Sequence, residues 1–195
     1  MRFLFLLIWI VFSFSAQAKV VDIGLYPQKN ISSFTFSPQS GEYIVYTERG
    51  KLKSITGSSL AVVKHQSGKL QLILDGNFQG SFEKINFIAP AAGSYFQLSG
   101  FQPNVEQGKF DDNLKLFVKN GKMQIVNNID LENYIAGVVE AEVGRLPPIE
   151  YLKLQAIICR TYALGNMQKH YADGYNLCSE VHCQAYNGKT HYKDI

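Results

Sequence analysis

The sequence predicts an α+β fold, with short antiparallel strands in the N-terminal part and a helical segment after them. Three observations lead to this prediction. Runs of alternating apolar and polar residues, separated by turn residues, extend from Val20 to about Val126. The Asn-Gly pair at residues 120–121 lies between two such runs, and this dipeptide is the strongest short-range signal for a β-hairpin. From Asp130 onward the apolar residues recur at helical spacing instead.

Nine strands are expected before the helical segment. The first alternates from Val20 to Tyr26 and stops at Pro27. Turns are expected at residues 48–50, 67–68 and 120–121, where Gly follows a polar residue. The predicted strands cover residues 20–26, 43–47, 51–55, 60–63, 70–74, 85–88, 95–98, 114–118 and 123–126. The chain therefore divides into residues 1–18, a β-rich region at 19–126 and a helical segment at 127–195.

A first helix is predicted directly after the last strand. Asp130 is a good N-cap residue, because its carboxylate can accept from the free backbone N–H groups of the first turn. Gly144 lies where a left-handed cap commonly ends a helix. The apolar residues in between recur at helical spacing and are Leu131, Tyr134, Ile135, Val138 and Val139.

A second helix is predicted after Pro147 and Pro148, since proline suits a first helical turn whose N–H groups have no partner. One apolar stripe on it consists of Leu152, Ala156, Cys159 and Ala163, and the polar residues beside the stripe are Gln155, Arg160, Thr161 and Tyr162. Gln and Arg so close to an apolar stripe are unusual for a plain solvent face. Ordinary surface polarity remains the alternative interpretation.

Residues 1–18 have the pattern of a secretory signal peptide. One basic residue, Arg2, precedes an apolar run that ends in the small-residue pattern Ala16-Gln17-Ala18. The run is short for a membrane span, and no cysteine follows the cleavage point to carry a lipid. We therefore expect a mature chain that begins near Lys19, has no stable membrane span, and is secreted or lies in the periplasm or cell envelope.

The charge balance excludes some classes of partner. Removing Arg2 lowers the formal net charge from +3 to +2. No basic patch indicates nucleic acid, and no polybasic run indicates a membrane surface. The 13 phenylalanines and 11 tyrosines suit a β-rich core, with a sugar-binding cleft as the alternative.

The helical segment resembles the SpoIID/LytB family, which comprises stage II sporulation protein D and the amidase enhancers. The family pattern reads Leu-Glu-x-Tyr-x-x-Gly-Val-Val, a Glu after two further residues, then Leu-Lys-x-Gln-Ala and Ala-Arg-Thr-Tyr-Ala. The corresponding residues here are 131–139, Glu142, 152–156 and 160–163. Residues 173–178 and 182–188 continue the likeness, which is specific across roughly 125–188. Family members continue beyond this segment, so we expect the domain to be incomplete at Ile195.

The resemblance implies an exported lytic transglycosylase that needs one catalytic acid and no cofactor. Such an enzyme cuts peptidoglycan glycan strands between N-acetylmuramic acid and N-acetylglucosamine and leaves a 1,6-anhydro-muramyl end. The family prefers strands stripped of stem peptides, so a cell-wall amidase would act upstream. The position of the acid corresponds to Glu142. We expect Val138, Val139 and Val143 to supply an apolar pocket that raises the pKa of this carboxyl.

A two-carboxylate mechanism is disfavoured by geometry. Glu140 and Glu142 are two residues apart, so on a helix they project about 200° apart. A hydrolytic glycosidase needs two carboxyl groups converging on one bond. At most one of them can therefore serve as the acid, and Glu140 stands where proline is common in the family.

Further site residues follow from the resemblance. We expect cleft support or sugar binding from Gln155, Arg160 and Tyr162, and an opposite cleft wall from His182, Gln184 and Tyr186. A structural ion pair of Arg160 with Glu132 or Glu150 is the alternative for that residue.

Three states remain open for the C-terminal cysteines. Cys178, His182 and Cys183 could bind zinc together with His170, as some family members bind it at this segment, although adjacent His and Cys need a bent loop to reach one ion. A Cys178–Cys183 disulfide is favoured by an oxidising compartment. Two free thiols are the third state. Cys159, on the apolar stripe, is expected to be a buried free thiol.

Two other functions stay open beside the enzyme. The first is a non-catalytic module that binds peptidoglycan or enhances an amidase. The second is a zinc-stabilised, β-rich secreted domain without catalysis.

Overall fold

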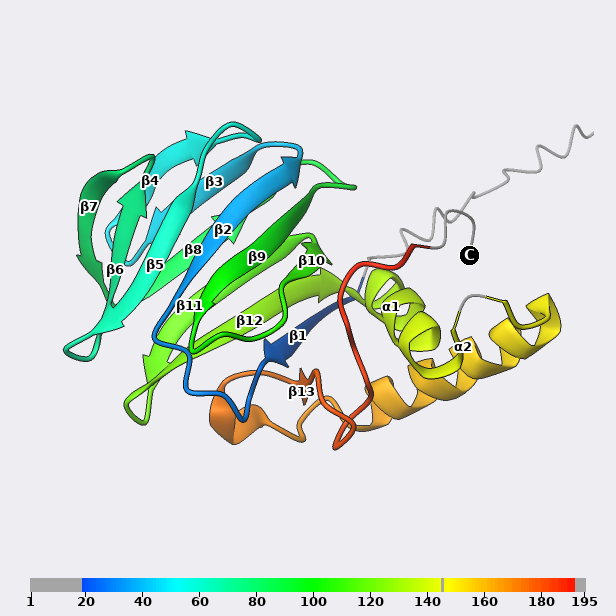
Figure 1. The fold of residues 1–195 in the computed structure, drawn as a ribbon. Coiled ribbons are helices and arrows are strands. Elements are labelled where there is room, and N and C mark those ends of the chain that lie inside the picture. The colour runs from blue at the N-terminus through cyan, green and yellow to red at the C-terminus, as the bar shows by residue number, and fades with distance from the viewer. Residues whose placement is uncertain (1–18, 145, 192–195) are drawn as a thin grey trace, which may run out of the picture.

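Two stacked β-sheets and two helices at one end of them make up the structure, a computed structural model (Figure 1). It describes residues 19–144 and 146–191, so the predicted signal peptide at 1–18 lies outside the described residues. The strands are mostly antiparallel and the two long helices follow residue 130, which confirms the predicted α+β class.

The larger sheet has seven strands in the order β13-β1-β12-β11-β8-β3-β4. Its strands are β1 (Val20–Leu25), β3 (Tyr43–Thr47), β4 (Gly50–Ile55), β8 (Lys84–Ile88), β11 (Asn113–Lys119), β12 (Lys122–Asp130) and β13 (Leu177–Cys178). All neighbours pair antiparallel except β1 and β13, which are parallel. The first strand of the described chain therefore lies between two strands from its C-terminal part.

The smaller sheet has six antiparallel strands in the order β10-β9-β2-β5-β6-β7. Its strands are β2 (Ser33–Ser40), β5 (Ala61–Gln66), β6 (Lys69–Leu74), β7 (Asn77–Phe82), β9 (Tyr95–Gln102) and β10 (Gly108–Asp111). All nine predicted strands are present, and the three predicted turns join β3 to β4, β5 to β6 and β11 to β12.

The sequence pattern did not reveal β2, β7, β10 and β13. In β2 the alternation of Phe34 and Phe36 is broken by Pro38, a residue that is typical of loops. Pro38 is tolerated because β5 pairs with β2 only as far as Phe36, so no ladder bond is needed from the proline nitrogen on that side. β10 and β13 contain four and two residues, too few for a periodic signal.

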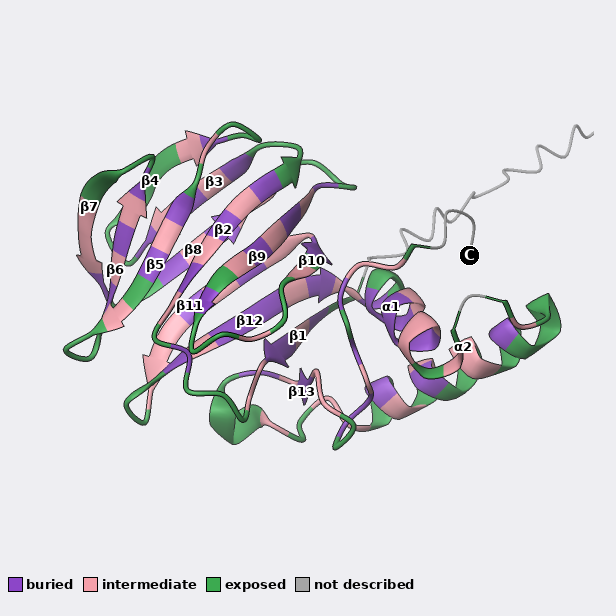
Figure 2. Ribbon diagram, viewed as in Figure 1, coloured by how far each residue is buried: buried purple, intermediate pink, exposed green. Residues whose placement is uncertain are grey.

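The core lies between the two sheets, and buried residues alternate along the strands that face it (Figure 2). Its centre is aromatic. Phe36 of β2 stacks on Phe87 of β8 across the sheets, with ring centroids 4.0 Å apart, and meets Tyr43 of β3 edge-on at 5.2 Å. The high aromatic content thus serves the β-core here.

Helix α1 (Leu131–Val143) continues directly from β12. Asp130 is its N-cap, as predicted, and accepts from the backbone nitrogens of Glu132 (2.8 Å) and Asn133 (3.4 Å). Gly144 follows its last turn, as predicted, and has a positive φ of 74°, but its ψ of −163° lies outside the left-handed helical region, so the expected left-handed cap is not formed. The predicted apolar residues of α1 are all buried, so they attach the helix to the end of the sandwich.

Helix α2 (Ile149–Gly165) packs against α1. Leu152, Cys159 and Ala163 of the predicted stripe are buried, and Ala156 is half-buried. The prolines lie just before the helix, with Pro148 at the N-cap, and not within its first turn as expected. Neither α1 nor α2, the long helices of the described chain, has the length and apolarity needed to cross a membrane.

The C-terminal part of the chain is held by β1. A short 3-10 helix (Tyr171–Asp173) leads into β13. The backbone nitrogen of Asn176 donates to the carbonyl of Asp22, and its side-chain Oδ1 accepts from the backbone nitrogen of Asp22, both at 2.8 Å. Tyr175 lies so close to Gly24 that a Cβ there would stand 2.5 Å from its ring. Only glycine permits this approach.

We expect Phe36→Ala to lower the free energy of unfolding by about 3–5 kcal/mol, because it leaves a cavity at the contact between the sheets. Phe78→Ala is the matched control, since Phe78 is 62% exposed, and its effect should stay within about 0.5 kcal/mol. Urea denaturation followed by circular dichroism measures both. Equal losses would show that the sheets do not share this core.

Candidate functional site

The predicted acid, Glu142, lies in the last turn of α1 and contacts α2. Its Oε2 accepts a hydrogen bond from Gln155 Nε2 at 2.7 Å. The thiol of Cys159, one turn further along α2, lies 3.7 Å from the same oxygen. No hydrogen bond to Oε1 is formed within the described ranges. Two α2 side chains thus hold one carboxylate oxygen, and the other is left available.

Cys159 therefore does more than pack in the apolar stripe of α2. Burial, and next the charge of Glu142, raise the pKa of its thiol to about 11, so the thiol stays protonated at neutral pH and acts as the donor. Its own backbone carbonyl accepts from Gln184 Nε2 at 3.3 Å. Its Sγ also lies 3.6 Å from Gln155 Nε2, so the three groups around the carboxylate touch one another.

The expected apolar pocket is not formed around this carboxylate. Val138 and Val139 are buried in the core and Val143 is half-buried, whereas Glu142 is exposed. Val138 does share a helix face with Glu142, but Glu142 lies one turn further along, where its contacts are with α2. The valines attach α1 to the sandwich and do not enclose the acid.

Glu140 and Glu142 diverge, as the helical geometry predicted. Glu140 accepts from Thr190 Oγ1 at 2.7 Å and also contacts His191, with its Oε1 3.0 Å from the imidazole Nδ1. These partners belong to the C-terminal segment, on the side of α1 away from Gln155. The two carboxylates cannot converge on one bond.

Arg160 forms the structural ion pair that was the alternative to sugar binding. Its Nε donates to Glu132 Oε1 at 3.0 Å, and its Nη2 donates to Glu132 Oε2. The fork joins α2 to the first turn of α1, so it fixes the angle between the two helices that carry Gln155 and Glu142.

Tyr162 lies towards the cysteine cluster and not beside Glu142. Its hydroxyl accepts from Lys169 Nζ at 2.9 Å, and the same ammonium donates to the carbonyl of His182 at 2.5 Å. Tyr162 and His182 are therefore linked through one lysine.

Gln184 and Tyr186 do not form an exposed opposite wall, which corrects the expectation for them. Gln184 is 6% exposed and accepts from Tyr134 Oη at 3.4 Å. Tyr186 is 3% exposed and donates to Asn127 Oδ1 at 3.0 Å. Both support the fold beneath the helices, because a buried polar group needs a partner and each has one.

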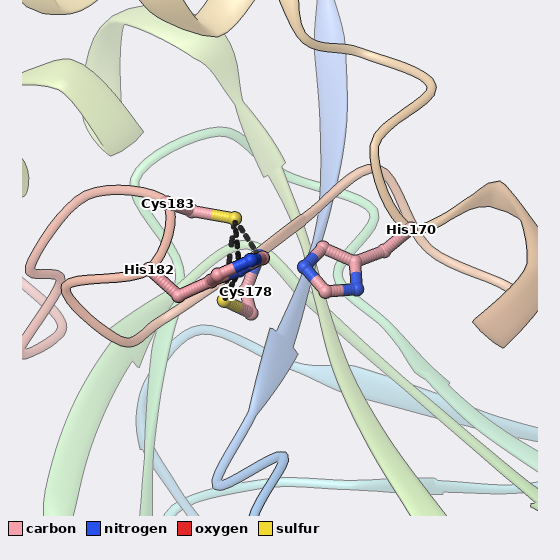
Figure 3. Close-up of side chains that lie close together, drawn as sticks. All are labelled: His170, Cys178, His182 and Cys183. Carbon is pink, nitrogen blue, oxygen red and sulfur yellow. Dashed lines mark hydrogen bonds between the residues drawn. The ribbon is translucent and has the colours of Figure 1, made fainter.

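His170, Cys178, His182 and Cys183 converge, and their ligand atoms all lie within 4.8 Å of one another (Figure 3). The two sulfurs are 3.2 Å apart, and each lies 3.8 Å from His182 Nδ1. A turn in which the nitrogen of Cys183 donates to the carbonyl of Glu180 supplies the bend that adjacent His and Cys need. Two thiols and two imidazoles are a donor set that suits tetrahedral zinc.

His170 has the surroundings of a metal ligand. Its Nδ1 lies 2.9 Å from Asp173 Oδ2, while its Nε2 is buried and has no hydrogen-bond partner. Metal-binding histidines usually carry such a carboxylate on the nitrogen away from the ion, because it fixes the ring and its tautomer. An unpaired buried nitrogen is otherwise costly. The residues therefore fit a zinc ion.

The cysteines are free thiols in the structure. The 3.2 Å separation of Cys178 and Cys183 exceeds the roughly 2.05 Å of a disulfide bond, so the two sulfurs are not bonded. Cys159 is a buried free thiol, as predicted.

The comparison with known families identifies this helical segment. Residues 119–194 match the family model of SpoIID, the stage II sporulation protein. These residues form a SpoIID segment. The match begins in β11, so it includes β12, both helices and the cysteine cluster. SpoIID is a cell-wall-related family of the sporulation and lytic-transglycosylase type.

The chain is also similar to an uncharacterized protein of Brachyspira hyodysenteriae, with 35% identity over 71 residues. The match covers 36% of this chain and 19% of the relative's length. No solved structure matches the chain significantly.

Three groups at the SpoIID segment were not identified as functional from the sequence. For Asp173 the sequence did contain a signal, because a carboxylate three residues after the candidate ligand His170 can reach the imidazole ring. Glu140 and the Cys159 contact with Glu142 gave none, because their roles depend on which segments pack on either side of α1.

Gly137 makes the close packing of the SpoIID segment possible. A Cβ at this position would stand 2.5 Å from the carbonyl oxygen of Gly188 and 2.7 Å from the Tyr186 ring. We expect Gly137→Ala to lower stability by about 1–3 kcal/mol through overpacking. Gly165→Ala in α2 meets nothing within 4 Å and should be neutral or stabilising by up to about 1 kcal/mol. Thermal denaturation tests both, and a neutral Gly137→Ala would contradict the contact.

Proposed function

We propose that this protein is an exported peptidoglycan lytic transglycosylase with Glu142 as its acid and base. One observation carries the proposal. The carboxylate at the end of α1 is held through Oε2 by Gln155 and Cys159 of α2, within a SpoIID segment. A positioned carboxylate with one oxygen available is what a single-residue mechanism requires.

In the proposed reaction the protonated carboxyl of Glu142 donates its proton to the glycosidic oxygen that joins N-acetylmuramic acid to N-acetylglucosamine. The bond from that oxygen to the anomeric carbon breaks. The 6-hydroxyl of the same muramic acid then forms a new bond to the anomeric carbon and gives its proton to the Glu142 carboxylate. No water is consumed, and the products are a 1,6-anhydro-muramyl end and a free 4-hydroxyl.

The substrate proposed is glycan from which stem peptides have been removed. An amidase partner would supply it, in the periplasm, cell envelope or cell exterior after residues 1–18 have directed export. We assign Gln155 to positioning of the acid, and Arg160 to the helix pair that holds Gln155 in place.

We further propose that the cysteine cluster holds a structural zinc ion. His170 through Nε2, Cys178, His182 and Cys183 would be its ligands. Four protein ligands leave no open position, so the ion would stabilise the segment and take no part in the chemistry.

The test of the acid compares Glu142→Gln with Glu140→Gln, incubated with denuded glycan strands. Mass spectrometry should detect 1,6-anhydro-muramyl products from the wild type and from Glu140→Gln. We expect Glu142→Gln to lower their rate at least 100-fold, because the amide cannot donate the proton. Circular dichroism confirms that each variant is folded. If Glu140→Gln abolished these products and Glu142→Gln did not, Glu140 would be the acid.

The test of the metal measures zinc in the purified protein by elemental mass spectrometry, with about one ion per chain expected. Asp173→Asn should weaken zinc affinity about 10–100-fold, as is typical for loss of the carboxylate behind a ligand histidine. Glu83→Gln, an exposed carboxylate in the β-sandwich, is the control. Protein that lacks zinc and weighs two hydrogens less would instead establish the Cys178–Cys183 disulfide.

A non-catalytic glycan-binding or amidase-enhancing module is the second candidate function. The exposure of Glu142 favours it, since no apolar pocket encloses this carboxylate. Glycan binding without products from any variant would support this function.

A further inference from the structure

A cavity of about 640 Å³ lies on the other side of α1 from Glu142. Helix α1 lines it with Gly137, Glu140, Ala141 and Gly144, whose spacing of three or four residues defines one helix face. The opposite walls come from β9, β10 and the loop between them, and from residues 187–191. The acid is not among the lining residues.

Hydrogen bonds and an ion pair join the walls of this cavity to one another. The nitrogen of Lys189 donates to the carbonyl of Lys109 at 2.7 Å, and Lys189 Nζ pairs with Asp111 at 2.6 Å. Glu140 accepts a hydrogen bond from Thr190 Oγ1 and lies in contact with the imidazole of His191. The cavity is therefore built by the fold before any ligand enters.

The lining is polar and offers both donors and acceptors. The side-chain amides of Gln97, Gln107 and Asn187 line it, and so do the exposed charges of Lys109 and Glu106. Neither Lys109 nor Glu106 forms an ion pair within the described residues. Gln97 Nε2 already donates to Gln107 Oε1 at 3.1 Å. An apolar ligand would still take the two charges and the remaining amide groups out of water without giving them partners, so a matching occupant carries hydrogen-bonding groups and charge itself.

We propose that this cavity is a second glycan subsite, which binds a muramic-acid-containing unit of the strand that is cut at Glu142. The inference rests on the proposed function. Gly144 lines the cavity and directly follows the last turn of α1, which carries Glu142, so the cavity and the acid lie at the same end of this helix.

The chemistry of the cavity favours muramic acid over a neutral sugar. Removal of the stem peptide leaves a free lactyl carboxylate on each muramic acid. Lys109, which has no ion pair with any residue that the structure describes, can bind it. The amides match N-acetyl groups, and Glu106 can accept from hydroxyl groups.

Calorimetry on the Glu142→Gln background, in which the strand is not cut, tests this subsite. The probes are denuded glycan oligomers, chito-oligosaccharides without carboxylates, and free stem peptide. We expect Lys109→Ala to weaken binding of the glycan oligomers about two- to fivefold, and Lys109→Glu about tenfold or more. Binding of chito-oligosaccharides should change little.

Lys122→Glu is the matched control, because Lys122 is an exposed lysine at the end of β12 remote from α1, and it should leave binding unchanged. Unchanged glycan affinity in both Lys109 variants would overturn the subsite, and so would binding of stem peptide alone. If the wild type nevertheless forms anhydro products, the proposed function stands without the subsite. Absence of both products and glycan binding would instead refute the proposed function.

Discussion

The parallel pairing of β13 with β1 is the interaction on which the C-terminal part of this molecule depends. Only two residue pairs form it, Ile23 with Leu177 and Gly24 with Cys178. The contacts of Asn176 with Asp22, and of Tyr175 with Gly24, extend it by two residues. Cys178 thereby has a fixed backbone, and the loop that carries His182 and Cys183 returns to it. A strand near the start of the described chain thus positions a metal-type cluster near its end.

The helices are positioned by a second set of contacts, and most of the family-pattern residues serve it. Arg160 joins α2 to Glu132 of α1, and Gly137 allows α1 to approach the backbone of Gly188. Gln184 links the carbonyl of Cys159 to the hydroxyl of Tyr134. The result is a rigid frame in which one carboxylate stands at the end of a helix. The recognisable sequence pattern therefore reflects mainly how that frame is built. Two exposed acids of α1 belong to the pattern, and Glu132 is paired with Arg160 whereas Glu142 is held by Gln155 and Cys159.

Local chemistry was predictable from the sequence, and long-range packing was not. Asp130, Gly144 and the Asn-Gly turn act within a few residues of themselves, so their positions in the sequence were sufficient. β2 was missed because Pro38 is acceptable only where β5 has stopped pairing, a fact about a partner strand. For the same reason Gln184 and Tyr186 were assigned to a cleft wall. Their type suits sugar binding, but burial beneath α1 depends on where residues 186–188 cross the helix.

The pairing of β1 also determines the order in which the chain can fold. Val20 pairs with Asp130, and Ile23 with Leu177, so β1 has no partner until most of the chain is available. Such distant pairings slow folding, because a long loop must close and lose conformational entropy before the contacts form that stabilise it. The smaller sheet needs only residues 33–111 and can form earlier. Until then β1 is an unpaired apolar strand, whose free backbone groups can pair with another chain, so this segment needs protection from aggregation.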